Sequence, residues 1–206
     1  PNAFFRPEIK HLLLSETKPF SIVYAGSMGP ENGPALAIEA MSKIIKKFPR
    51  ATLTLIGGGR KEVEDVLKGL ITKLKLENSV NYRGFVATNK EMLDIVRHHR
   101  ISIAPYQAIT NSVRWYADAV KIRTSMACGL PVITTQIPPM GKEAERQGAG
   151  IVVKDDVGQL ADAVIKVFSD EKLYKKMREN AISAAKDNTW ENSYTNALKS
   201  MGVKVS

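Results

Sequence analysis

The chain has 206 residues, enough for one α/β domain with a sizeable core or for two very small domains. Its apolar content of 44% and charged content of 25% are typical of soluble globular proteins, and no apolar run approaches the ~20 residues of a membrane-spanning helix. The single cysteine, Cys128, excludes an internal disulfide and a cysteine-built metal site and favours a reducing compartment. Residues 1–19 lack a basic stretch followed by an apolar one, so no secretory signal is expected.

The net charge of +9 leaves two interpretations open. The excess of lysine and arginine can attract an anionic partner such as nucleic acid, a membrane face or a phosphorylated small molecule. It can equally be a set of solvated side chains on helix surfaces, since no concentrated basic block is present. The densest cluster, residues 97–100, ends a predicted helix, where cations complement the helix dipole. Nucleic acid is therefore not the expected partner.

Short apolar runs rich in β-branched residues alternate along the chain with stretches of helical periodicity. In chain order, strands are predicted at residues 20–25, 51–56, 79–83, 101–104, 131–134 and 150–153. Helices are predicted over residues 37–48, 63–74 and 90–97, within 116–128, and around 157–168, 173–177 and 190–201. This alternation predicts an α/β fold with a doubly wound parallel sheet (Rossmann-like) of about six strands and helices on both faces.

The loops that directly follow strands are the expected place for a ligand. Right-handed crossovers bring all strand C-termini to one edge of such a sheet, and ligands bind outside that edge. The loops concerned are residues 26–33, 57–60, 84–88, 105–121 and 135–141. Residues 105–116 form the longest connection without predicted structure, and long loops in compact domains tend to carry function.

Two of these loops are rich in glycine. Gly57-Gly58-Gly59-Arg60 follows a strand and opens a helix, so its backbone amides and the arginine suit a phosphate. A tight turn with an exposed arginine explains the same residues equally well, and the spaced glycines of a dinucleotide fingerprint are missing. Residues 26–34 suit an anion cradle built from backbone amides, although they contain no lysine or arginine.

The stretch from Tyr116 to Pro131 contains a predicted helix, a glycine stop and the start of a strand. Asp118 is predicted to cap the helix. Lys121 lies near the helix start, where a cation is unfavourable unless an anion shares the site. It is therefore a candidate functional cation, whereas Ile122 and Met126 are most simply core residues.

The sequence offers neither a metal site nor a nucleophile–base pair. His11, His98 and His99 have no metal-ligand spacing with carboxylates or with the cysteine. No paired carboxylates fall on one helix face, and Asp155-Asp156 is predicted to cap the helix that follows. The residues alone thus indicate an α/β domain suited to phosphate, with no bound metal.

The most distinctive segment of the sequence is MACGLPVITT, residues 126–135. It is accompanied, in order, by residues 24–33, 53–59 (LTLIGGG), 80–86 (VNYRGFV), 148–153 (GAGIVV) and 160–164. Together these segments resemble the glycosyltransferase group 1 family of GT-B enzymes over roughly residues 20–200. The opening residues 1–7 resemble the short segment between the two domains of that family.

The resemblance implies a nucleotide-sugar donor held against this domain and an acceptor carried by a separate N-terminal domain, with no metal or other cofactor required. Residues 1–19 would be the interdomain segment and residues 20–206 the C-terminal donor-binding domain of a longer protein. The backbone around Phe85 and Val86 would meet the base, and amides of residues 105–118 the diphosphate and sugar. The final helix would pack toward the N-terminal domain, and the anomeric configuration would be retained.

Two cationic positions of the family are altered in the loop that follows the first strand. The family usually places an arginine after Gly26 and a lysine before Gly33, and this chain has Ser27 and Asn32 instead. Those cations normally offset the charge that develops on the leaving diphosphate, which is a transition-state role. The loop therefore lacks the family's usual charge.

Two acidic positions are altered as well. The family's two glutamates, eight positions apart, align with Tyr116 and Thr124, and the second normally binds the donor ribose. Some members carry a lysine three residues before that glutamate, as Lys121 does here, so Lys121 and Arg123 are candidates to supply the missing charge. The predicted catalytic residue is Lys121, and the predicted donor-binding residues are Gly26, Ser27, Asn32, Gly33, Gly57, Gly58, Arg60, Phe85, Val86, Tyr116, Asp118, Arg123 and Thr124.

The leading hypothesis is a donor-binding domain of a hexosyltransferase-type glycosyltransferase, inactive as an isolated fragment. The altered polar positions motivate an alternative: a catalytically degenerate domain of the same fold that binds a nucleotide or only a partner. A sugar-nucleotide epimerase is a third interpretation, disfavoured because its acid/base carboxylates and histidines are not evident. A cytoplasmic location is expected, with peripheral contact at the inner face of the membrane left open.

Overall fold

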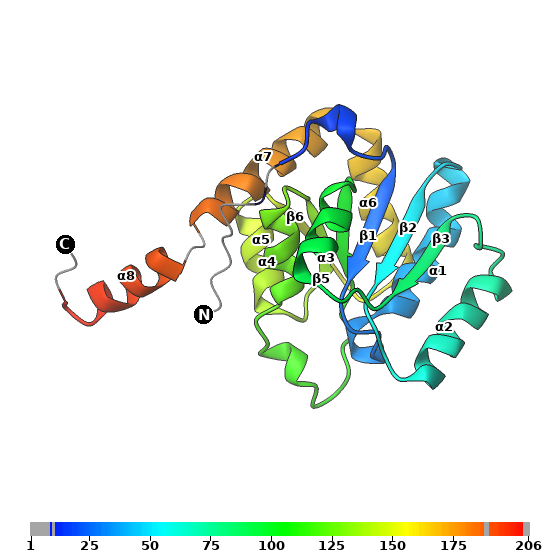
Figure 1. The fold of residues 1–206 in the computed structure, drawn as a ribbon, viewed down its shortest axis with the longest axis horizontal. Helices are drawn as coiled ribbons and strands as arrows, with labels where there is room; N and C mark the ends of the chain where they lie inside the picture. The colour runs from blue at the N-terminus through cyan, green and yellow to red at the C-terminus, as the bar shows by residue number, and fades with distance from the viewer. Residues whose placement is uncertain (1–8, 10, 188–189, 204–206) are drawn as a thin grey trace.

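The computed structural model describes residues 9, 11–187 and 190–203, which build a parallel sheet of six strands wrapped by helices (Figure 1). The strands are β1 (Ser21–Ala25), β2 (Thr52–Ile56), β3 (Val80–Gly84), β4 (Ile101–Ala104), β5 (Val132–Thr135) and β6 (Gly150–Val153). Their order across the sheet is β3-β2-β1-β4-β5-β6, and every neighbouring pair is parallel. The predicted Rossmann-like fold is thus confirmed. Residues 1–7, predicted to be an interdomain segment, lie outside the described residues.

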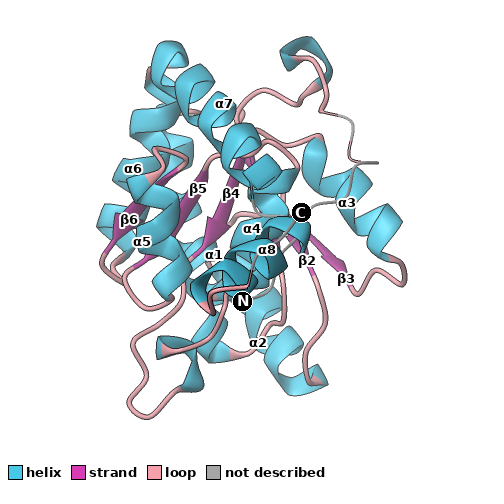
Figure 2. Ribbon diagram, turned by 90° about the vertical axis from the view of Figure 1, so that its left-hand side faces the viewer, coloured by secondary structure: helices cyan, strands magenta, loops and turns pink. Residues whose placement is uncertain are grey.

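The helices lie on both sides of the sheet (Figure 2). They are α1 (Pro34–Lys47), α2 (Lys61–Lys73), α3 (Asn89–Arg97), α4 (Val120–Ala127), α5 (Pro139–Arg146), α6 (Val157–Ser169), α7 (Glu171–Asp187) and α8 (Trp190–Ser200), with short 3-10 helices η1 (Leu14–Glu16), η2 (Pro30–Asn32) and η3 (Val113–Trp115). Asp156 caps α6 by accepting a hydrogen bond from Gln159, as predicted. α8 projects away from the sheet beyond the end of α7 (Figure 1), and its packing toward another domain stays a prediction.

One helix departs from the sequence-based expectation. α5 begins at Pro139, inside residues 135–141, which were predicted to be a loop. Pro138 and Pro139 are adjacent at the start of this helix. Proline is nevertheless tolerated in the first turn of a helix, because the amide hydrogen that it lacks has no intrahelical acceptor there.

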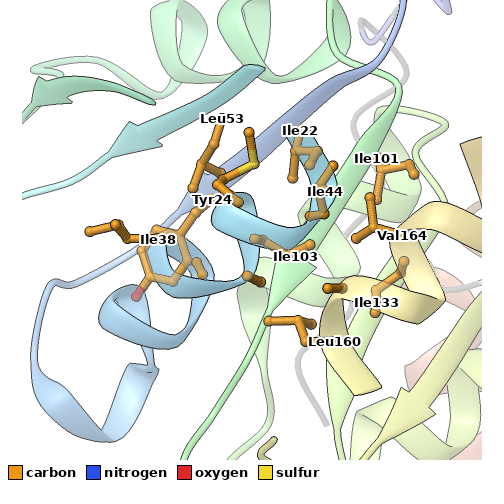
Figure 3. Packing of buried hydrophobic residues seen from close by; sticks show 14 of the residues in the cluster. Ile22, Tyr24, Ile38, Ile44, Leu53, Ile101, Ile103, Ile133, Leu160 and Val164 are labelled. Atoms are coloured by element: carbon orange, nitrogen blue, oxygen red, sulfur yellow. The ribbon is translucent and has the colours of Figure 1, made fainter. Parts of the chain in front are cut away.

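Side chains of β1 alternate between two cores. Ile22 and Tyr24 are fully buried with residues of α1 and α6 on one face of the sheet (Figure 3). Val23 packs on the other face with Val96 of α3 and Cys128 at the end of α4. Burial on both faces explains why β1 is almost continuously apolar.

The segment before β1 is fastened to α4 and α7. His11 Nε2 lies 3.0 Å from the carbonyl oxygen of Ala127. The buried guanidinium of Arg178 donates hydrogen bonds to Leu12 O at 2.6 Å and to Gly129 O at 3.0 Å. This segment was assigned to an interdomain linker, and the boundary of that linker stays a prediction.

Gly33 joins η2 to α1 and brings the loop after β1 against the chain after β4. Its φ of +70° lies in the left-handed region, and a Cβ atom built there would be 1.7 Å from the carbonyl oxygen of Pro105. Both features require glycine. The two loops at the centre of the sheet edge are therefore packed backbone to backbone.

We expect Gly33→Ala to lower the free energy of unfolding by about 2–4 kcal/mol, because the added methyl group strains the backbone and displaces Pro105. Gly69 is the matched control, since it is exposed in the interior of α2 with no atom within 4 Å of an added Cβ. Gly69→Ala should raise stability by about 0.5–1 kcal/mol. Urea denaturation of both variants checks this, and equal stability of the two would contradict the packing described here.

His99 is a buried histidine that connects α3 to β2. It is 2% exposed, with Nδ1 2.8 Å from Ile95 O and Nε2 2.9 Å from Thr54 Oγ1. Because a carbonyl can only accept, Nδ1 carries the hydrogen and Nε2 accepts from the threonine hydroxyl. Desolvation lowers the pKa of His99 to about 4.

Acid should therefore destabilise the fold through His99. Between its ordinary pKa and the lowered one, the unfolded chain binds a proton that the folded chain does not, so stability falls as the pH drops from 6.5 to about 4. The loss amounts to about 3 kcal/mol. His99→Gln, which keeps a donor and an acceptor, should flatten this part of the pH–stability profile. A profile of His99→Gln as steep as the wild type would show that other groups cause the loss.

Candidate functional site

A cavity of about 910 Å³ opens at the C-terminal edge of the sheet, where the strand order reverses between β1 and β4. Doubly wound folds bind ligands at this point. Of the predicted site residues, the following line the cavity: Gly26, Ser27, Asn32, Gly57, Gly58, Phe85, Val86, Asp118, Lys121 and Thr124. Gly33, Arg60, Tyr116 and Arg123 are not among the lining residues.

The side chain of Lys121 reaches from the start of α4 to the end of β1. Its Nζ atom lies 4.7 Å from the ring centre of Tyr24 and 4.4 Å from that of Tyr106. Nζ also donates hydrogen bonds to Tyr24 Oη at 3.4 Å and to Asn32 Oδ1 at 3.5 Å. A Cβ atom on Gly26 would lie 2.8 Å from Lys121 Cε, so glycine there leaves the room that the lysine occupies.

This enclosure changes the acidity of Lys121. Loss of hydration is the main cause that lowers its pKa to about 7, and the positive charge of Arg114 lowers it further, while Glu31 acts in the opposite direction. Burial also raises the pKa of Tyr24 and that of Tyr106 well above their ordinary value. The two phenol groups around the lysine therefore stay neutral. The lysine can thus gain or lose its charge near neutral pH.

Arg114 is a second cation at the cavity wall. It lies in η3, within the long loop after β4, and its Nη2 atom is 3.6 Å from Glu31 Oε1. Glu31 Oε1 also accepts a hydrogen bond from Asn32 Nδ2 at 3.2 Å. Glu31 and Arg114 therefore link the loop after β1 to the loop after β4.

The residues at the altered family positions differ in their surroundings. Asn32 is 2% exposed and Thr124 is 5% exposed, and both are uncharged parts of the cavity wall. Ser27 is exposed, and its carbonyl oxygen accepts a 2.5 Å hydrogen bond from Tyr24 Oη. Lys121 Nζ is thus placed beside Asn32, in the loop where the family usually has its own cations.

Two backbone amides of the Gly57-Gly58-Gly59 turn donate hydrogen bonds within the protein and are not free for a ligand. Gly57 N–H donates to Gly84 O at 2.9 Å, and Gly59 N–H donates to the Glu64 carboxylate at 3.1 Å. Glu64 lines the cavity on this side, and Arg60 is exposed outside it. Phosphate binding by Arg60 stays a prediction, and the structure adds a carboxylate to this side of the site.

Asp118 does not cap α4 as predicted. The N-cap is Ala119, without a side-chain cap, and the Asp118 carboxylate instead accepts a hydrogen bond from Arg123 Nε at 2.8 Å. Arg123 is a charged donor, and its hydrogen bond to the Asp118 carboxylate takes the place of a bond to the backbone N–H groups at the helix start. Tyr116 is 89% exposed and is not among the residues that line the cavity.

Several lining residues were not predicted from the sequence: Ala25, Ile56, Glu64, Met92, Tyr106, Arg114 and Val120. Arg114 had a usable signal, because it is the one cation between Pro105 and Val120, in a loop already expected to be functional. Tyr106 and Glu64 had none, since an aromatic residue after a strand and a glutamate in the first turn of a helix are common in core and cap positions.

Within the described part of the chain, no three histidine, cysteine or carboxylate side chains gather in a way that could hold a metal ion. A metal-free reaction stays a prediction. The same residues include no helix that is long and apolar enough to span a membrane.

Sequence comparisons connect the chain to sugar-transferring proteins. A family model described as glycosyl transferases group 1 matches residues 5–184. The chain is 27% identical over 163 residues to YtcC of Bacillus subtilis (strain 168), covering 78% of this chain and 39% of that protein. It is 25% identical over 183 residues to the D-inositol 3-phosphate glycosyltransferase of Jonesia denitrificans, covering 86% and 41%. The chain thus spans about two fifths of these relatives.

Solved structures share the fold. The crystal structure of Anabaena Alr3699/HepE in complex with UDP and glucose superposes with a TM-score of 0.72 at 20% identity, over 88% of this chain and 48% of that one. The C-terminal domain of a glycosyl transferase group 1 family protein (LpcC) from Francisella tularensis gives a TM-score of 0.70 at 21% identity, over 82% and 86%. The second structure corresponds to this chain in extent.

Ligand binding should draw a proton onto Lys121. Above pH 7 the free lysine is largely neutral, and an anion beside it favours the charged form, so if a nucleoside diphosphate binds in this cavity, its binding at about pH 8 should take up close to one proton. Over about pH 7–9 the affinity should fall by up to about tenfold per pH unit. Calorimetry in two buffers of different ionisation enthalpy measures the uptake. Binding without proton uptake at that pH would show that the diphosphate does not meet this lysine.

Proposed function

The chain belongs to glycosyl transferases group 1, and on that premise we propose that it is the nucleotide-sugar-binding domain of a sugar-transferring enzyme. In this proposal the chain holds the donor, and an acceptor-binding region outside the chain completes the cleft. The enzyme is of hexosyltransferase type and uses no metal. Peripheral contact with an anionic membrane is part of the same proposal, supported by the net charge of +9.

The observation that carries the proposal is the enclosed ammonium group of Lys121, which faces a cavity at the reversal of the strand order. A leaving nucleoside diphosphate gains negative charge in the transition state. A cation held in place and shielded from water stabilises such charge more strongly than a hydrated one. Lys121 is accordingly the proposed catalytic residue, with Nζ donating a hydrogen bond to the leaving diphosphate.

The rest of the cavity suits a nucleoside. Phe85, Val86 and Met92 present apolar side chains on the β3 side, where a base can stack or pack. The Thr124 hydroxyl and the Glu64 carboxylate are polar groups that can accept hydrogen bonds from ribose hydroxyls. UDP is the first nucleotide to test, because it is the one bound in the Anabaena structure of the same fold.

Ser27, Asn32 and Thr124 favour a second candidate, a degenerate domain that binds no donor. Each is an uncharged residue at a position where the family usually carries a charge. Under this candidate Lys121 is a buried structural cation, and the cavity binds nucleotides weakly or not at all.

Calorimetric titration with UDP, GDP and ADP separates the two candidates. We expect saturable binding of one nucleotide to the 206-residue chain, and Lys121→Ala should weaken it by about 10- to 100-fold, because a charge-assisted hydrogen bond is lost. Lys46→Ala, an exposed lysine in the last turn of α1, is the matched control and should bind like the wild type. Absence of binding by every nucleotide would favour the degenerate domain.

The chain alone should transfer no sugar, because the acceptor side of the cleft lies outside it in this proposal. Incubation of the 206-residue chain with the nucleotide sugar that it binds, followed by chromatography of the products, tests this. A folded 206-residue monomer that transfers sugar to an added acceptor would refute the proposal that the acceptor is bound outside this chain.

A further inference from the structure

Two positive charges at the cavity wall share one carboxylate. Lys121 and Arg114 are the cations among the described lining residues, and Glu31 is the carboxylate beside them, 3.6 Å from Arg114 Nη2. The charge of Arg114 disfavours that of Lys121, whereas Glu31 favours it. One negative charge cannot offset both cations in a partly dehydrated site. Lys121, Arg114 and Glu31 together therefore carry one positive charge in excess, which an anionic ligand can offset.

The other two carboxylates of the cavity have partners elsewhere. Asp118 accepts a 2.8 Å hydrogen bond from Arg123, and Glu64 accepts one from Gly59 N–H at 3.1 Å, on the β2 side. With Asp118 paired to Arg123, the excess charge next to β1 and β4 is positive, whereas Glu64 adds a negative charge on the β2 side. A ligand with one anionic end and one neutral end would bind in a single orientation, with its anionic end at Lys121.

Arg114 has hydrogen-bond donors to spare. Its Nε atom is buried and has no hydrogen-bond partner among the described residues, and its ion pair with Glu31 is long at 3.6 Å. A guanidinium group presents five N–H donors in a fork that matches the oxygens of a phosphate. The Arg114 side chain is therefore held at the cavity wall while some of its N–H groups remain free to bind a ligand.

The backbone around Arg114 is fixed by local bonds. Its N–H donates to Ser112 Oγ at 3.2 Å, and Trp115 Nε1 donates to Ile109 O at 3.3 Å within the same loop. Gln107 N–H donates to Glu31 O at 3.2 Å, which ties the loop to η2. These bonds place Arg114 and Glu31 side by side before any ligand arrives.

We propose that Arg114 and Lys121 together bind the diphosphate of the donor, and that Glu31 holds Arg114 until the diphosphate displaces it. This inference rests on the proposed function. Lys121 supplies an enclosed point charge from α4, and Arg114 supplies a two-pronged contact from η3. The diphosphate cations of this chain thus come from the segment after β4, while Ser27 and Asn32 after β1 carry no charge.

Titrations of the 206-residue chain with UDP and uridine at about pH 6, below the lowered pKa of Lys121, test the proposal. Arg114→Ala should weaken UDP binding by about 10- to 100-fold and leave uridine binding unchanged, because only UDP carries the phosphates. Arg50→Ala removes the same charge at an exposed turn before β2, far from the C-terminal edge, and should bind UDP like the wild type.

The variant Glu31→Gln tests whether Arg114 binds an anionic ligand or whether its ion pair with Glu31 only supports the loop. Removing the competing carboxylate should tighten UDP binding by about 3- to 10-fold, a change opposite to that of Arg114→Ala. If the ion pair only holds the loop in shape, both variants should weaken UDP and uridine binding alike. That result would overturn the proposal, as would UDP binding by Arg114→Ala at wild-type affinity.

Different binding results would contradict the Arg114 assignment and the donor-binding function. If the wild type binds UDP and Arg114→Ala binds it equally well, the diphosphate lies elsewhere and the donor-binding function stands. If the wild type binds none of the nucleotides, nor inorganic pyrophosphate, both the function and the assigned subsite are wrong.

Discussion

The enclosure of the Lys121 ammonium group between Tyr24 and Tyr106 is the interaction on which the rest of the site depends. It joins the end of β1, the segment after β4 and the start of α4 around one charge. It also explains two sequence features at once, because Gly26 leaves space for the lysine side chain and Asn32 offers it an oxygen. A cation removed from water in this way gains most from an anionic ligand.

The fold makes this enclosure possible by bringing two loops together at the reversal of the strand order. Gly33 lets the loop after β1 lie against the backbone of Pro105, and Gly57 lets the turn after β2 approach Gly26 O. With the backbones so close, side chains from the segment after β4 can reach the end of β1. Lys121 Nζ thus lies 3.5 Å from Asn32 Oδ1, in the loop after β1, although the lysine itself comes from the segment after β4.

The sequence predicted all six strands, with strand ends within one residue of those observed. Most of them are buried and leave a clear apolar signature, and β3, with its exposed Asn81 and Arg83, is the exception. It also predicted the sheet edge at which the cavity opens. It did not predict the partners of Asp118, since an aspartate before a helix resembles a cap whether or not an arginine competes for it. Arg114 was missed although it is the one cation in its loop, because a loop without periodicity does not indicate which side chains turn inward.

A crystal structure of this chain with UDP bound would test the proposed diphosphate site most directly. We predict diphosphate oxygens within hydrogen-bonding distance of both Lys121 Nζ and the Arg114 guanidinium, with Glu31 separated from Arg114. A diphosphate bound instead at the Gly57–Arg60 turn, with the Glu31–Arg114 pair intact, would contradict it.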